Sequence, residues 1–165
     1  MLSGLAKDCA TSMGGIKTVY IANYDDVTSV SLEGDTINSV EMADGKKFLQ
    51  YNFRKGTGSM TSTLTIDAAN GVNYVTTDLV LSFLKMETTK RIEMAALAVN
   101  ELAIIVEDCN GKLWYLGYDE AVTATSGTGE TGQARGDGNK YTITLQDTSV
   151  SYPYEVEESA LTSLI

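Results

Sequence analysis

Polar and apolar residues alternate along most of the chain, as they do in β-strands that bury only one face. The clearest case is "KKFLQYNFRKGTGSMTSTLTID", in which two alternating runs flank a glycine-containing turn. Its apolar positions are Leu49, Tyr51, Phe53, Met60, Leu64 and Ile66. Its polar positions are Gln50, Asn52, Arg54, Thr61, Thr63 and Thr65. The pattern predicts an antiparallel hairpin over residues 47–66 with one apolar and one polar face.

Runs rich in β-branched and aromatic residues predict further strands on both sides of this hairpin. Before it come "IKTVYIAN" and then two strands joined at the turn residues Gly34 and Asp35. After it come "VNYVTTDLVLSFLKM", "LAIIVEDCNGKLWYLG", "KYTITLQD" and "SVSYPYEVEE". The run from Leu102 to Val106 is apolar at every position, so we expect this strand to lie deep with both faces buried.

One segment, "TTKRIEMAALAVNEL", changes to the period of a helix. Its apolar positions are Ile92, Ala95, Ala96 and Val99. Thr88 or Thr89 is suited to cap the N-terminus. We therefore predict one amphipathic helix in this segment, with these apolar positions on its buried face.

The length and composition indicate a single domain, because 165 residues that are 43% hydrophobic can enclose one sizeable core. We expect an N-terminal arm over residues 1–15, with a short helix ended by Gly14 and Gly15. A β-rich domain over 16–155 and a C-terminal tail over 156–165 follow. Residues 123–138 contain no aliphatic side chain larger than alanine and are predicted to form a glycine-rich loop. The expected fold is mainly β, an antiparallel sandwich or half-barrel with one flanking α-helix.

Two short strings in this loop resemble known motifs, but their context does not support them. Gly127, Gly129 and Gly132 have the spacing of a dinucleotide-binding turn. That turn requires a buried strand before it and a helix after it, and Glu130 would place negative charge against a phosphate. The tripeptide from Arg135 to Asp137 is the cell-adhesion string, which occurs by chance in loops. We predict neither nucleotide binding nor adhesion.

The charge and the missing residue types exclude several function classes. The chain has 12 basic and 22 acidic residues, a net charge of −10, and no histidine. An acidic surface does not bind the phosphates of nucleic acid. Without histidine, the chain lacks the commonest general base and metal ligand. The two cysteines, Cys9 and Cys109, do not form a metal-binding pair. We expect no enzyme activity, catalytic residues, metal, cofactor or membrane span.

The order of elements carries more information than any short motif. The stretches "AIIVEDCNGKLWYLGYDEA" and "RGDGNKYTITLQDTSVSYPYEV", with "CATSMGGIKTVYIANYDDV" before them, cover a little under half of the chain. In these stretches the chain resembles bacteriophage tail tube proteins and related tail or neck ring subunits, including those of crAss-like phages. It is more distantly similar to the tube subunit of type VI secretion systems.

The resemblance implies a structural virion subunit that assembles in the cytoplasm of the bacterial host. Its copies would form a ring, which is hexameric in tubes. DNA would pass through the ring without specific binding. Other tail or neck proteins would be its partners. The resemblance does not separate a stacking tube subunit from a single neck ring, which can be dodecameric. It implies that a polar sheet face lines the channel, here Gln50, Asn52, Arg54, Thr61, Thr63 and Thr65. The candidate subunit contacts are Leu2, Leu5, Gly129, Arg135 and Asp137.

A second interpretation assigns the chain to a different functional class, the binding modules. A small acidic β-sandwich could instead bind carbohydrate or a protein partner, with the glycine-rich loop as its contact surface. An exposed aromatic platform would favour that interpretation. The only tryptophan, Trp114, lies in a strongly apolar strand and is expected to be buried.

Overall fold

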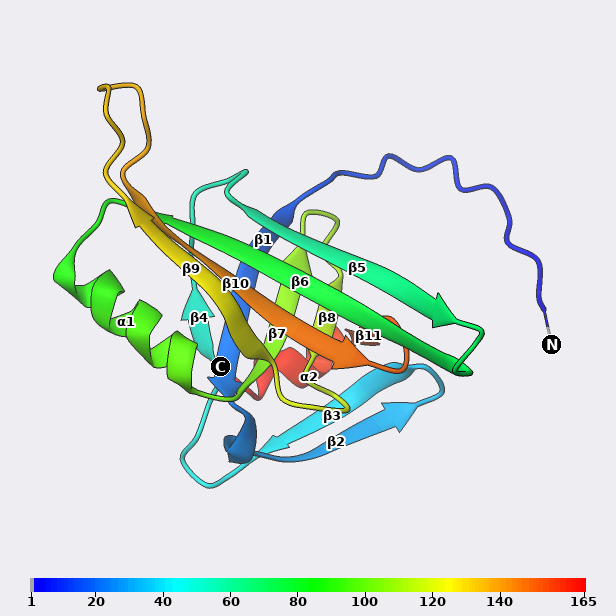
Figure 1. Ribbon diagram of the computed structural model, residues 1–165. Coiled ribbons are helices and arrows are strands. Elements are labelled where there is room, and N and C mark those ends of the chain that lie inside the picture. Colours follow the sequence, from blue (N-terminus) through cyan, green and yellow to red (C-terminus); the bar gives the residue numbers. More distant parts are fainter. Residues whose placement is uncertain (1) are drawn as a thin grey trace.

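Two β-sheets stack on each other in the computed structural model, which describes residues 2–165 (Figure 1). The larger sheet has seven strands in the order β2-β3-β11-β8-β7-β1-β4, and the smaller has four in the order β5-β6-β10-β9. This architecture confirms the predicted β-sandwich with a flanking helix. Met1, the first residue of the predicted arm, lies outside the described residues.

The elements begin and end close to the predicted runs. The seven-stranded sheet contains β1 (Ile16–Asn23), β2 (Val27–Glu33), β3 (Thr36–Met42), β4 (Leu49–Tyr51), β7 (Leu102–Asp108), β8 (Leu113–Leu116) and β11 (Tyr154–Val156). The four-stranded sheet contains β5 (Gly58–Asp67), β6 (Val72–Leu84), β9 (Thr123–Glu130) and β10 (Lys140–Ser149). The helices are α1 (Thr88–Val99), α2 (Glu158–Thr162) and the 3-10 turn η1 (Tyr24–Asp26). Neighbouring strands are antiparallel except for β11 and β3.

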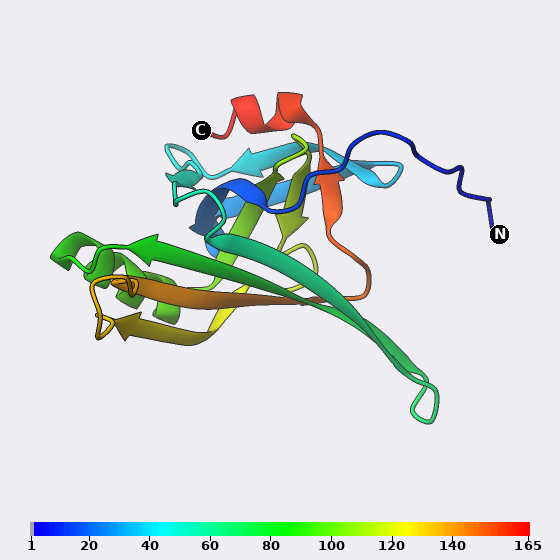
Figure 2. The same ribbon diagram turned by 90° about the horizontal axis from the view of Figure 1, so that it is seen from above.

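The apolar strand β7 lies between two hydrophobic cores, as its sequence predicts. Ile104 and Val106 face the inner core, which lies between the two sheets. Ala103 and Ile105 face the outer core, which lies on the opposite side of the larger sheet with α2. Figure 2 shows α2 on the side of the larger sheet that faces away from the four-stranded sheet. A strand buried on both faces needs apolar residues at every position, and β7 has them.

The helix α1 forms where it is predicted, but the predicted buried face is wrong. Leu97 is 3% exposed and Met94 packs against the inner core, whereas Ile92 is 56% and Val99 81% exposed. The Tyr51 hydroxyl donates a hydrogen bond to the carboxylate of Glu93, which lies on the same face of the helix as Leu97. The helix therefore buries the face that contains Met94 and Leu97. Glu87 occupies the N-cap position and makes no capping bond through its side chain.

The predicted hairpin over residues 47–66 is also wrong, because its two arms belong to different sheets. Strand β4 pairs with β1, whereas β5 pairs with β6 along its whole length. A turn closed by the hydrogen bond from Thr57 N to Arg54 O carries the chain from one sheet to the other. Alternation in sequence identifies a strand and its faces but not its partner. All ten residues of β5 pair with β6, whereas β4 pairs with β1 over only three residues.

The predicted glycine-rich loop is partly a strand, because Thr123–Glu130 forms β9 and pairs with β10. Only residues 131–139 remain as a loop. An edge strand is held by backbone hydrogen bonds on one side, so it forms without large apolar side chains. Gly129 has a steric role: an added Cβ would lie 2.9 Å from Tyr141 Cε1 and 3.2 Å from the Met86 methyl group. Gly129 therefore allows close packing between β9 and its neighbours.

The two glycines of β9 provide a matched test of this packing. We expect Gly129→Ala to lower the free energy of unfolding by about 1–2 kcal/mol, because the methyl group overpacks against Tyr141. At Gly127 the nearest contact of an added Cβ is an ordinary 3.6 Å to Thr142 O. Gly127→Ala should therefore leave stability within about 1 kcal/mol of wild type, or increase it. Urea unfolding of both variants tests the packing, and equal losses would contradict it.

The two ends of the described chain behave differently. The predicted C-terminal tail, 156–165, is instead part of the fold, since Ala160, Leu161 and Leu164 are buried in the outer core. The backbone N–H of Phe48 also donates to Leu164 O at 2.9 Å. Residues 2–14, by contrast, are exposed and form neither helix nor strand. The predicted helical arm is therefore extended in this structure.

Candidate functional site

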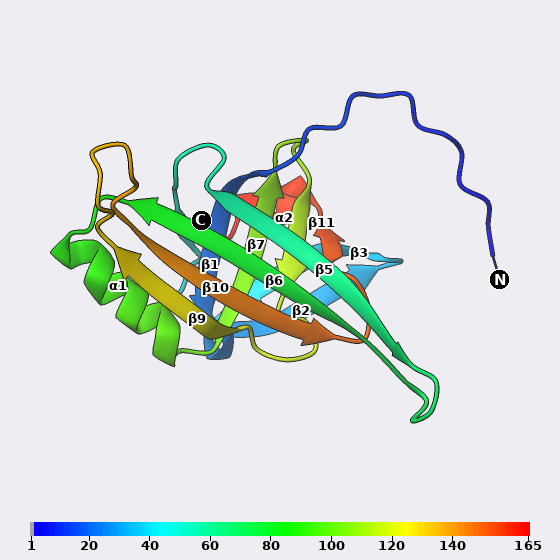
Figure 3. The same cartoon turned by 45° about the horizontal axis from the view of Figure 1, so that its top comes forward.

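The most distinctive surface is the outer face of the four-stranded sheet, which no element of residues 2–165 covers (Figure 1 and Figure 3). The strand registers place mainly hydroxyl side chains on it. Its polar members are Ser59, Thr61, Thr63, Thr65, Asp67, Thr76, Asp78, Ser82, Thr123, Ser126, Thr128, Glu130, Lys140, Thr142, Thr144, Gln146 and Thr148. Its less polar members are Val72, Tyr74, Val80 and Leu84. We call this surface the outer face.

Hydrogen bonds between neighbouring strands order the side chains of the outer face. Ser82 Oγ and Thr142 Oγ1 lie 2.9 Å apart, and Gln146 Nε2 donates to Asp78 Oδ1 at 2.8 Å. Lys140, the only basic residue in the four strands, is paired with Glu130 at 3.2 Å. The outer face is therefore polar, hydrogen-bonded and without an unpaired positive charge.

The structure divides the predicted polar face into two unrelated parts. Thr61, Thr63 and Thr65 lie on the outer face, on β5. Gln50 lies in β4 of the other sheet, and Asn52 and Arg54 follow β4 in the connection to β5, so none of the three is part of the four-stranded sheet. The reason is the crossing of the chain between sheets after β4. The contributions of β6 and β10 were missed, although the alternating threonines of "KYTITL" are a signal for them.

Both side edges of the four-stranded sheet are open, because β5 and β9 each have a neighbouring strand on one side only. Natural sheets normally protect such edges with lysine, proline or covering elements. Neither β5 nor β9 contains lysine, arginine or proline. Neither edge is paired with a further strand, although α1 lies beside β9.

Apolar features accompany these edges. Leu64 and Ile66 lie on the inner side of β5 and are largely exposed, since the β5–β6 hairpin extends beyond the rest of the domain (Figure 2). On the opposite flank, a hollow of about 420 Å³ lies between α1 and β9 and is lined by Met94, Ala98 and Tyr141 among others. The β5 edge thus carries exposed apolar side chains, and the β9 edge has a hollow beside it.

The predicted subunit-contact residues are spread over separate elements. Leu2 and Leu5 are fully exposed on the arm. Gly129 belongs to β9, and Arg135 is exposed in the 131–139 loop. Asp137 accepts hydrogen bonds from the backbone N–H groups of Ala134 and Gln133, which lower the pKa of its carboxyl group. Asp137 therefore shapes this loop, and the contact roles of all five residues stay predictions.

A buried carboxyl group, Asp147, was missed in the sequence. It is 2% exposed on the inner side of β10, and its Oδ1 accepts a hydrogen bond from Gly117 N at 3.2 Å. Burial raises its pKa to about 6, and the nearby charges of Asp119 and Glu120 raise it as well. The signal was its register, because Ile143, Leu145 and Asp147 occupy successive inward positions of β10.

Other polar groups have structural explanations. Asp108 accepts hydrogen bonds from Asn110 N, Lys112 N and Trp114 Nε1, so it organises the turn between β7 and β8. Trp114 packs against the inner core and does not form an exposed platform. Within residues 2–165, no group of three or more His, Cys, Asp or Glu side chains is placed to hold a metal ion. Over the same residues, every helix is too short or too polar to span a bilayer.

The geometry of the candidate site is therefore an uncovered polar sheet with two open edges, beside a flanking helix and an extended arm. Comparison of the chain with protein-family models, with curated proteins and with solved structures finds no match.

Proposed function

We propose that this protein is a structural subunit of a phage tail tube or head–tail ring, in which copies close into a ring around a channel for DNA. The observation that carries the proposal is the outer face, a hydroxyl-rich sheet surface bounded by two strands whose outer edges are unpaired. The resemblance of the element order to tail tube and ring subunits points the same way. A hexamer is the expected assembly.

Lateral pairing of β5 in one copy with β9 in the next explains both open edges at once. The two edges lie on opposite flanks of one sheet, so the contact is head-to-tail, and such contacts close into a ring when the rotation permits. Leu64 and Ile66, on the inner side of β5, would then approach the hollow beside β9 of the neighbouring copy. A closed barrel has no free edge, which removes the tendency to aggregate.

The same pairing sets the width and character of the channel. Each copy contributes four strands, so six copies exceed the 16–18 strands that already enclose an aqueous channel in porins. The outer face would line this channel with hydroxyl and amide groups. A polar lining without unpaired bases, in a protein of net charge −10, lets a polyanion pass without binding it.

The proposal predicts that the full-length protein forms rings in negative-stain images. Thr63→Lys should add positive charge to the lumen of these rings without preventing their formation. Thr63 is an exposed residue of the outer face, so the substitution should change the free energy of unfolding by no more than about 0.5 kcal/mol. Rings of this variant should bind DNA in a gel-shift assay at low salt and release it at high salt. Wild-type rings should not bind DNA.

Ser31→Lys is the matched control, because Ser31 is an exposed residue on β2 of the other sheet. It adds the same charge outside the proposed channel and should not produce ring-dependent DNA binding. Equal DNA binding by both variants would show that the outer face does not line a lumen. A protein that stays monomeric over a wide concentration range would overturn the ring itself and favour the alternative, a monomeric binding module.

A further inference from the structure

The outward side of α1 carries an apolar stripe that nothing in residues 2–165 covers. Ile92 and Val99 are 56% and 81% exposed, and Ala95 between them is also exposed. These positions fall on one side of the helix, opposite the buried Leu97. A helix that is apolar on both sides is normally covered on both sides. The stripe therefore indicates a missing contact.

The arm carries a second apolar stripe at the same spacing. Its apolar residues recur at intervals of three and four positions, which is the period of a helix. They are Leu2, Leu5, Ala6, Cys9, Ala10 and Met13. The residues between them are polar or glycine, and Gly14 and Gly15 follow at the position where helices often end. Gly15 has the left-handed φ of 99° that this position favours.

Most of the arm has no partner among the described residues 2–165. Residues 2–12 are exposed along their whole length and make no hydrogen bond to the β-rich domain in the described structure. Met13 and Asn110 then fix its end, through hydrogen bonds of 2.8 and 2.9 Å. A helix of about twelve residues is marginal in water on its own, so an apolar surface is needed to stabilise it.

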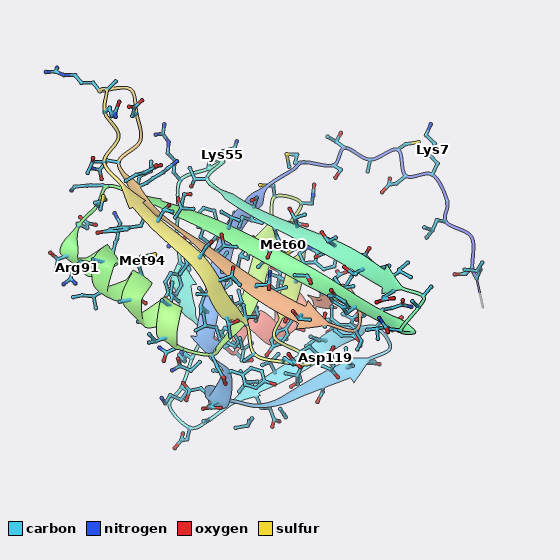
Figure 4. All side chains as sticks on the ribbon, viewed as in Figure 1. Lys7, Lys55, Met60, Arg91, Met94 and Asp119 are labelled. Atoms are coloured by element: carbon cyan, nitrogen blue, oxygen red, sulfur yellow. The ribbon has the colours of Figure 1, made fainter. Side chains whose placement is uncertain are left out.

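The arm and α1 lie on opposite flanks of the molecule. Figure 4 shows Lys7 of the arm far from Arg91 and Met94 of α1, with the sheets between them. A helix of about twelve residues is roughly 18 Å long, whereas a domain of this size is roughly 35–40 Å across. A helical arm anchored at Met13 cannot cross that width to reach α1 of the same copy. It can reach α1 of a neighbouring copy.

We propose that the arm folds into a helix against the outward stripe of α1 on the adjacent copy. The inference rests on the proposed ring, because β5 and the arm leave from one flank while β9 and α1 occupy the other (Figure 1). The contact is helix-on-helix and head-to-tail, and it couples folding of the arm to assembly. It supplies apolar contacts beyond the backbone pairing of β5 with β9.

Single charged substitutions in each stripe test the contact. Leu5→Asp and Val99→Asp each place a carboxylate in a surface that is exposed in the monomer, so thermal unfolding of dilute protein should not change. Each should raise the midpoint concentration of assembly, measured by light scattering, at least about tenfold. Thr11→Asp, on the polar side of the arm, is the control and should assemble as wild type does. Far-UV circular dichroism should show helix content increasing with assembly of the wild type.

Mixing the two defective variants makes the test specific. Leu5→Asp keeps an intact α1 stripe and Val99→Asp keeps an intact arm, so a 1:1 mixture should form mixed dimers where neither variant associates alone. Rings formed equally well by the wild type and both variants would overturn the arm contact while leaving the ring proposal standing. A wild type that stays monomeric, with a mixture that does not associate, would overturn both.

Discussion

Leu97→Ala is expected to lower the free energy of unfolding by about 2–5 kcal/mol. Leu97 is 3% exposed and packs into the inner core from α1, together with Met94. Truncation removes buried methyl groups and leaves a cavity where α1 meets the inner core, which the surrounding side chains cannot easily close. Urea unfolding of dilute protein measures this loss.

Ile92→Ala is the matched control on the same helix. The sequence pattern places Ile92 on the buried face, whereas in the structure it is 56% exposed. In dilute protein its truncation should therefore change the free energy of unfolding by no more than about 0.5 kcal/mol. If Ile92→Ala were the more costly of the two substitutions, α1 would have to be turned about its axis relative to this structure.

The orientation of α1 shows what periodicity can and cannot predict. Spacing identified a helix over the correct residues, because a 3.6-residue period does not depend on the partner. The helix has apolar residues on both sides, however. Packing decides whether the side of Leu97 or the side of Ile92 and Val99 is buried. The Tyr51–Glu93 hydrogen bond, which helps to decide it, joins residues 42 positions apart.

Strand identity was more predictable than strand pairing for a similar reason. The apolar run of β7 predicts burial on both faces, and the structure confirms it. The pairing of β4 with β1 and of β5 with β6 depends on lengths and turns elsewhere in the chain. The outer face was therefore predicted only in part, through Thr61, Thr63 and Thr65. Strand β9 was missed because its pairing partner, and not its composition, makes it a strand.

Asp147 escaped sequence analysis because polar residues near strand ends usually face solvent. Its register on β10 places it inward instead, paired across the sheet with Thr77, which is also buried. The neighbouring segment from Gly117 to Glu120 supplies one N–H donor and two further carboxylates nearby. One hydrogen bond does not replace the water that an ionised carboxylate loses on burial. The group therefore favours its neutral form, which raises its pKa.

This environment predicts that the folded protein loses stability as the pH rises through the range in which Asp147 ionises. Its folded-state pKa is about 6, above the ordinary aspartate value of 3.8, so between these values the folded state binds more protons than the unfolded state. The contribution of Asp147 to the free energy of unfolding is complete below about pH 4 and is lost as the pH rises through 6. The difference between the two pKa values corresponds to a loss of about 3 kcal/mol.

Asp147→Asn is therefore expected to stabilise the protein at pH 7–8 by about 1–3 kcal/mol and to have little effect at pH 4. Asparagine retains an oxygen that can accept the hydrogen bond from Gly117 N but carries no charge. Glu120→Gln, at an exposed neighbour that raises the pKa of Asp147, should move the pH dependence to lower pH without removing it. Urea unfolding of dilute protein from pH 4 to pH 8 measures all three proteins. Parallel curves for wild type and Asp147→Asn would show that the carboxylate is well solvated or paired in the folded state, contrary to its burial here.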